Sequence, residues 1–173
     1  MQNTNTISEE QQKKLLRNIR RWLLFFMIAL VLSGITAFPI QTEVNFFLSV
    51  RDYLPLPDVM LHWLEYIAKG VNSTMATFPQ VFYGCDWLAF SHIVIALFFI
   101  GVYKNPVQNA WVLRIGLIAC AGIIPLAFIG GSVRDIPVFW RLIDCSFGVF
   151  GSLPLLYVLH LIKKLENASK PWY

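Results

Sequence analysis

The sequence predicts an all-α membrane protein, a four-helix transmembrane bundle with a short amphipathic-helix cap on the outer face. Four apolar runs are each long enough to cross a bilayer, which takes about 20 mostly apolar residues in a helix. They lie at residues 22–40, 86–103, 111–129 and 138–162. The chain of 173 residues is 57% hydrophobic and only 14% charged, which leaves little room for a soluble domain. We therefore expect a single polytopic domain over residues 1–173.

Each run is predicted to be helical because backbone groups in hydrocarbon must bond within their own segment. The first run is too long for the core of a cleavable signal peptide, and Ile35-Thr36-Ala37 is a poor cleavage site, so we expect this span to be retained. Before it, Ser8-Glu9-Glu10 is typical of a helix start. Apolar residues at helical spacing follow, which predicts an interfacial or cytoplasmic helix that continues into the first span.

The only long loop, residues 41–85, connects the first two spans. Its pattern predicts a helix from Asp58 to about Lys69, with Gly70 as its stop. This helix has an apolar side and a polar side, so we expect it on the outer membrane surface or across the mouth of the bundle.

The two later connections are short, which predicts that the last three spans are sequential antiparallel neighbours. Small residues at helical spacing permit two helices to approach closely in a membrane. In the third span these are Gly116, Ala119 and Cys120, and in the fourth they are Gly148, Gly151 and Ser152.

The net charge of +4 is distributed as a topology signal. Lysines and arginines precede the first span, separate the second from the third, and follow the fourth, so all lie on one side if the spans alternate. The positive-inside rule then predicts a multi-pass cell-membrane protein with both termini in the cytoplasm, which suits a bacterial inner membrane. We expect membrane lipids, a lipid-like ligand and a membrane-protein partner or second copy as partners, and no nucleic acid.

Ionisable residues inside the spans are the candidates for function, because charge within a bilayer is costly. His92 lies six residues into the second span and Asp144 seven residues into the fourth, about 9 and 10 Å along the helices at about 1.5 Å per residue. Ser33 lies at a similar depth in the first span. These positions predict one layer below the outer rim, with His92 and Asp144 as a hypothetical catalytic acid/base pair.

Further polar residues near the outer rim are predicted to bind a ligand around this pair. Arg141 or Arg134 would hold an anionic group such as a lipid phosphate. Arg141 and Asp144 lie three residues apart on one helical face and can pair, which is the basis of a purely structural alternative, a polar network that fixes helix register. The predicted ligand-binding residues are Ser33, Asp86, Trp87, Arg134 and Arg141.

Several sharper chemistries lack the necessary pattern. No H-x-x-x-H or H-E-x-x-H motif is present, so no metal site is predicted, and the sequence indicates no particular cofactor. A serine triad of Ser33, His92 and Asp144 has the right residue types but no visible oxyanion hole. The residues do not decide between catalysis and binding.

The leading functional hypothesis is an outward-facing ionisable pocket that binds or processes a lipid-like or amphipathic small molecule. The alternative is a non-enzymatic accessory or structural subunit of a larger membrane complex, with a lipid-facing stripe of small residues. An ion or solute carrier is disfavoured because the inner halves of the first two spans are nearly all apolar. The four-span plan resembles the emopamil-binding class of sterol isomerases and ligand-binding proteins in architecture alone, and no functional residue is carried over.

Overall fold

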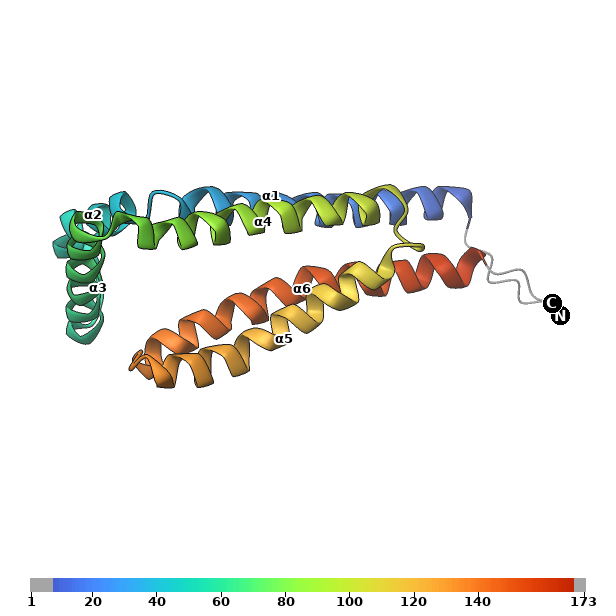
Figure 1. The fold of residues 1–173 in the computed structure, drawn as a ribbon. Coiled ribbons are helices and arrows are strands. Elements are labelled where there is room, and N and C mark those ends of the chain that lie inside the picture. Colours follow the sequence, from blue (N-terminus) through green and yellow to red (C-terminus); the bar gives the residue numbers. More distant parts are fainter. Residues whose placement is uncertain (1–7, 170–173) are drawn as a thin grey trace. The chain divides into compact units, whose positions relative to one another are not determined.

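The computed structural model describes residues 8–169, which form six α-helices, two short 3-10 helices (Arg51–Tyr53 and Pro79–Phe82) and the turns between them, with no strand in that range. Four of these helices are long and apolar enough to cross a membrane. They are α1 (Glu9–Ala37), α4 (Tyr83–Lys104), α5 (Ala110–Val133) and α6 (Val138–Ser169) (Figure 1). The predicted all-α class and the four helices with the length and composition of membrane spans are therefore confirmed.

The chain divides into two compact units, and the boundary passes through α1 and α4. We call residues 29–95 the loop unit. The second unit comprises residues 1–28 and 96–173, of which 8–28 and 96–169 are described, and we call it the hairpin unit. Each unit thus contains part of α1 and part of α4, and each is described by itself below.

The helix start predicted at Ser8 is confirmed, and α1 begins at Glu9. The Ser8 hydroxyl accepts a hydrogen bond from the Gln11 backbone N–H at 3.3 Å, and the Gln11 side-chain oxygen accepts one from the Ser8 N–H at 3.0 Å. This reciprocal pair satisfies donors that a helix leaves free in its first turn. The helix then runs without a break for 29 residues to Ala37, so the segment before the first span and the span itself form one helix, as predicted.

Apolar side chains from all four long helices form the core of the hairpin unit. Aromatic rings and one amide tie the helices together. The Asn18 side-chain amide donates to the Tyr157 hydroxyl at 3.0 Å and so joins α1 to α6. The rings of Phe26 and Phe99 lie 5.0 Å apart and join α1 to α4. The fully buried side chains are Ile19, Leu23, Val102, Leu113, Leu155, Val158 and Ile162.

Helices α5 and α6 pack side by side as an antiparallel hairpin (Figure 1). The predicted close contact is confirmed at Gly116, Cys120 and Gly148, whereas Ala119 is exposed. A Cβ atom on Gly148 would lie 2.6 Å from the carbonyl oxygen of Cys120, and one on Gly116 would lie 3.0 Å from the Leu155 side chain. Only a residue without a side chain permits this distance between the two backbones.

In the loop unit, α1 ends at Ala37, just before Phe38-Pro39. Proline has no N–H and disfavours helical geometry in the residue before it. Helix α2 (Ile40–Ser49) follows and packs against α3 (Asp58–Thr77). Side-chain amides link the two helices: Asn72 exchanges hydrogen bonds of 2.8 and 3.2 Å with Asn45, and Gln41 donates to Asn72 at 2.9 Å.

The prediction that Gly70 stops α3 is wrong, because the helix continues to Thr77 and has 20 residues. Contacts beyond the glycine explain the continuation. Val71 is buried, and Asn72 bonds to α2. These contacts offset the roughly 1 kcal/mol by which glycine disfavours a helix interior relative to alanine. The segment predicted as a short cap is thus two α-helices of 10 and 20 residues, and its position on the outer face stays a prediction.

Candidate functional site

His92 lies on α4, where this helix passes close to α1 within the loop unit. A Cβ atom on Gly34 would lie 2.7 Å from the carbonyl oxygen of Ala89 and 3.2 Å from the Cβ of His92. The sequence reasoning missed Gly34, although a glycine within an apolar span is a signal for close helix packing. Gly34 therefore sets the distance between α1 and the part of α4 that carries His92.

The hydrogen bond of His92 determines which ring nitrogen carries the proton. Its Nδ1 lies 2.9 Å from the carbonyl oxygen of Leu88, one helical turn earlier. A carbonyl oxygen can only accept, so Nδ1 donates. In the neutral ring Nε2 then presents a lone pair, and no hydrogen bond to it is made by residues 8–169. The ring is thus oriented by its own helix, with Nε2 available to a ligand.

Of the other predicted site residues of the loop unit, Ser33 and Trp87 are more exposed than His92, and Asp86 is half-buried as His92 is. Ser33 is exposed, and its backbone carbonyl accepts a bond from the Thr36 hydroxyl at 3.3 Å. Asp86 is half-buried in the first turn of α4, where a carboxylate stabilises the helix dipole. Trp87 is 56% exposed and its ring contacts Tyr83 edge to face. None of these three residues therefore lies in a buried site: each has a local structural role or is exposed.

The ion pair between Arg141 and Asp144, on which the structural alternative depends, is absent within residues 8–169. Arg141 instead bonds to the α5–α6 turn. Arg141 Nε donates to the carbonyl oxygen of Ile136 at 2.6 Å, and one terminal nitrogen donates to the Ser132 hydroxyl at 2.8 Å. The side chain passes over Gly131, where a Cβ atom would lie 2.9 Å from it. Because Gly131 has no side chain, Arg141 has room to reach the turn.

The geometry of the turn explains why Arg141 donates hydrogen bonds to it. Helix α5 ends at Val133, and Asp135 adopts a φ of 53°, the left-handed conformation that commonly ends helices. The N–H of Ile136 then bonds back to the Gly131 carbonyl at 2.9 Å. Arg141 satisfies a further carbonyl of this turn, and hydrogen bonds from charged donors contribute about 1.5–3 kcal/mol each. Arg134 is exposed at the same turn.

Asp144 is half-buried on α6, and its carboxylate makes no hydrogen bond or ion pair within residues 8–169. It lies six residues beyond Val138, about 9 Å along the helix at about 1.5 Å per residue. An acid in a spanning helix without a partner is unusual, because charge in hydrocarbon costs free energy. Asp144 belongs to the hairpin unit and His92 to the loop unit, so their meeting in one layer stays a prediction.

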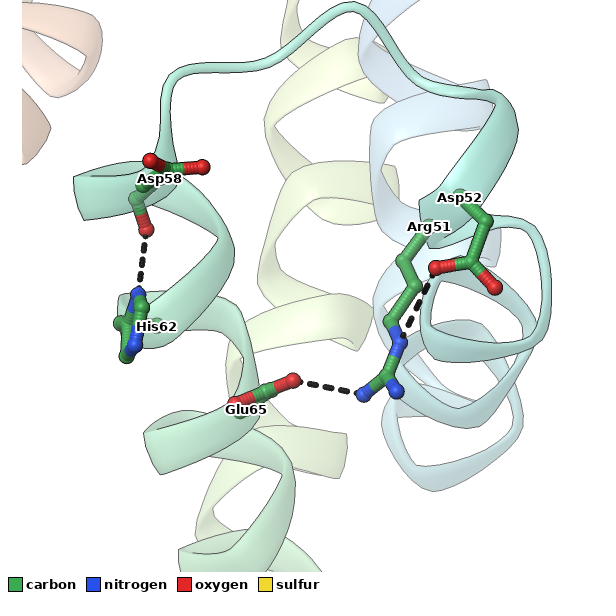
Figure 2. Close-up of polar contacts among 5 residues, drawn as sticks. All are labelled: Arg51, Asp52, Asp58, His62 and Glu65. Atoms are coloured by element: carbon green, nitrogen blue, oxygen red, sulfur yellow. Dashed lines mark hydrogen bonds and ion pairs between the residues drawn. The ribbon is translucent and has the colours of Figure 1, made fainter.

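Three ionisable residues of the long loop, in contrast, form ion pairs with one another. Figure 2 shows Arg51 between two carboxylates, at 2.6 Å from Glu65 on α3 and 3.5 Å from Asp52. His62 Nδ1 lies 2.7 Å from the carbonyl oxygen of Asp58. All of these groups are exposed. They brace the connection between α2 and α3 and leave little charge for a ligand.

Among the described residues, no group of three or more histidine, cysteine, aspartate or glutamate side chains is arranged to hold a metal ion. Cys85, Cys120 and Cys145 are free and half-buried.

No family model, curated protein or solved structure matches this chain. The architectural resemblance to the emopamil-binding class therefore has no support from a relative.

Proposed function

We propose that this protein binds a lipid-like or amphipathic small molecule within the membrane through ionisable side chains of its spans. The observation that carries the proposal is Asp144, a half-buried acid in α6 without a partner in residues 8–169. An aspartate costs up to about 2.5–3.5 kcal/mol at the centre of a spanning helix, and Asp144 lies about 9 Å along α6 at about 1.5 Å per residue, within the span. The presence of such an acid within a span is explained if a ligand or a water-filled site supplies hydrogen bonds to its carboxylate.

His92 supports the same proposal from the loop unit. Its bond to Leu88 leaves Nε2 as an acceptor, so the polar end of the ligand is best matched by a hydroxyl or an amine. A neutral imidazole in this state is also suited to act as a general base, which would extend binding to chemistry. Arg141 is engaged by the turn, so among the predicted arginines Arg134 is the better match for an anionic group.

The variants His92→Ala and Asp144→Asn are expected to reduce the amount of co-purified small molecule at least severalfold while the protein still folds. Native mass spectrometry of gently extracted protein measures this, with Asp52→Asn as the control. The control makes the same carboxylate-to-amide change at an exposed position of the long loop. If the double variant loses no more than each single variant, both residues act on one ligand. Full retention of the molecule by both single variants would refute the proposal.

The alternative function, an accessory subunit of a larger membrane complex, is favoured by one feature of α5. Ala119 and Gly122 are exposed, and a Cβ atom on Gly122 would meet nothing within 4 Å. Small residues on an open helix face permit a partner helix to pack closely. The same mass measurement separates the two functions, because a partner subunit would co-purify as a protein chain and would be retained by the His92 and Asp144 variants.

We also propose that the protein lies in a bacterial inner membrane and that both of its termini are in the cytoplasm. The exposed lysines and arginines at the start of α1 and at the ends of α4 and α6 support this orientation. Alkaline phosphatase is active only where its disulfides form, outside the cytoplasm. We therefore expect an active fusion after Asp135 and an inactive fusion after Asn105. The reverse pattern of activity would contradict the orientation.

A further inference from the structure

A groove of about 460 Å³ lies in the hairpin unit between the N-terminal part of α1 and the end of α4. Its walls combine positive charge with apolar surface. Four basic side chains of α1 line it together with Leu16 and Leu24, and Tyr103 of α4 closes one side. The basic residues are Lys13, Arg17, Arg20 and Arg21.

The spacing along α1 explains why these residues form one surface. Lys13, Arg17, Arg20 and Leu24 follow one another at intervals of four, three and four, so they share a helix face. The three cations occupy the N-terminal end of this face and the leucine lies toward the span. The face therefore changes from charged to apolar in the direction in which a helix enters a membrane.

Arg20 is held in place against α4. Its Nε donates to the backbone carbonyl oxygen of Tyr103 at 3.3 Å, and its guanidinium carbon lies 5.6 Å from the centre of the Tyr103 ring. These contacts leave the terminal nitrogens of Arg20 free to donate. None of the four cations forms an ion pair with a carboxylate of residues 8–169. The groove is thus a preformed positive site without an internal anion.

The length of α1 places this groove near the lipid headgroups. The helix has 29 residues, about 44 Å at about 1.5 Å per residue, whereas the hydrocarbon core is about 30 Å thick. Because the lysines and arginines of α1 all precede the apolar run from Trp22, we expect the excess length to extend beyond the hydrocarbon at the first turns. Leu24 and the following apolar residues remain within it, so the groove spans the boundary between headgroup and acyl chains.

We propose that this groove binds the phosphate headgroup of an anionic phospholipid, with Leu16, Leu24 and Tyr103 against the start of the acyl chains. Basic pockets at membrane-facing helix ends bind such headgroups by charge and hydrogen bonds. A free phosphate would use the cations but not the apolar wall, so the combination favours a lipid. The groove belongs to the hairpin unit and His92 to the loop unit, and the proposal does not depend on the function proposed above.

The test uses the purified full-length protein in nanodiscs of phosphatidylcholine with and without phosphatidylglycerol. Native mass spectrometry counts the lipids that remain bound to the protein after it is released from the nanodisc. We expect selective retention of phosphatidylglycerol by the wild type and about thirtyfold weaker retention by Arg17→Gln/Arg20→Gln, since two basic residues near the headgroups are removed. The matched control Lys163→Gln/Lys164→Gln removes the same charge from exposed positions of α6 outside the groove.

The control double variant is expected to retain phosphatidylglycerol as the wild type does. Equal loss in both double variants would overturn the proposal, because the effect would then be general charge attraction. Displacement of the lipid from the wild type by inorganic phosphate would overturn it in favour of a free-anion site. If Arg17→Gln/Arg20→Gln does not fold, as judged by circular dichroism, Lys13→Gln/Arg21→Gln tests the same groove with the same expectation.

Discussion

Replacing Gly148 by alanine is expected to lower the free energy of unfolding by about 2 kcal/mol or more, within the usual range for an overpacked core. The added Cβ would lie 2.6 Å from the backbone carbonyl oxygen of Cys120 and 3.4 Å from Ile123. A backbone atom cannot swing aside as a side chain can, so α5 and α6 must separate. Van der Waals contact is the main force between membrane helices, and separation removes it.

The measurement is unfolding by sodium dodecyl sulfate of the purified protein in detergent micelles, followed by circular dichroism. Gly122→Ala is the matched control, since it makes the same change in the facing helix where a Cβ would meet nothing within 4 Å. Alanine is the better helix former by about 1 kcal/mol, so the control is expected to be neutral or stabilising. Wild-type stability in Gly148→Ala would show that α5 and α6 do not cross at this glycine.

The second large effect is expected for Gly34→Ala, which tests the loop unit. Its Cβ would lie 2.7 Å from the backbone carbonyl oxygen of Ala89 and 3.1 Å from the Ile93 side chain. We expect a loss of about 2 kcal/mol in the free energy of unfolding, because α1 must move away from α4. The same displacement moves α1 away from His92, so this variant is also expected to retain less of any ligand that His92 binds.

Gly70→Ala serves as the control for Gly34 in the same unit. Gly70 lies inside α3, where an added Cβ would contact nothing within 4 Å. This control is expected to gain up to about 1 kcal/mol from helix propensity. If Gly34→Ala is as stable as Gly70→Ala, the close passage of α1 over α4 at Ala89 is wrong.

Local patterns predicted the helices well but not where one of them ends. The apolar runs indicated all four spans, and the small residues around Gly148 indicated the α5–α6 contact. Gly70 misled the prediction for α3, because local propensity favours a stop there. The helix continues because Val71 and Asn72 contact other residues of the loop unit, and Asn72 bonds to residues 27 and 31 positions earlier. A local pattern contains no information on such distant contacts.

The candidate site was predicted less completely than the fold. The predicted depth of His92 counts from residue 86, but α4 begins at Tyr83, three residues earlier, so the shared level of His92 and Asp144 stays a prediction. The direction in which a side chain points does not follow from its spacing along the sequence. Arg141 has the correct spacing for a pair with Asp144, yet it bonds to the turn because Gly131 leaves space and Ser132 and Ile136 offer acceptors.

The sequence alone determined that this chain is a helical membrane protein with four spans, because hydrocarbon leaves the backbone of an apolar run only its own carbonyls to bond. It also determined which ionisable residues lie within the spans. Only the tertiary structure decided which glycines permit close packing, where Arg141 donates, and that Tyr103 closes a basic groove on α1. These features depend on atoms brought together from distant positions, and their energies change within fractions of an ångström.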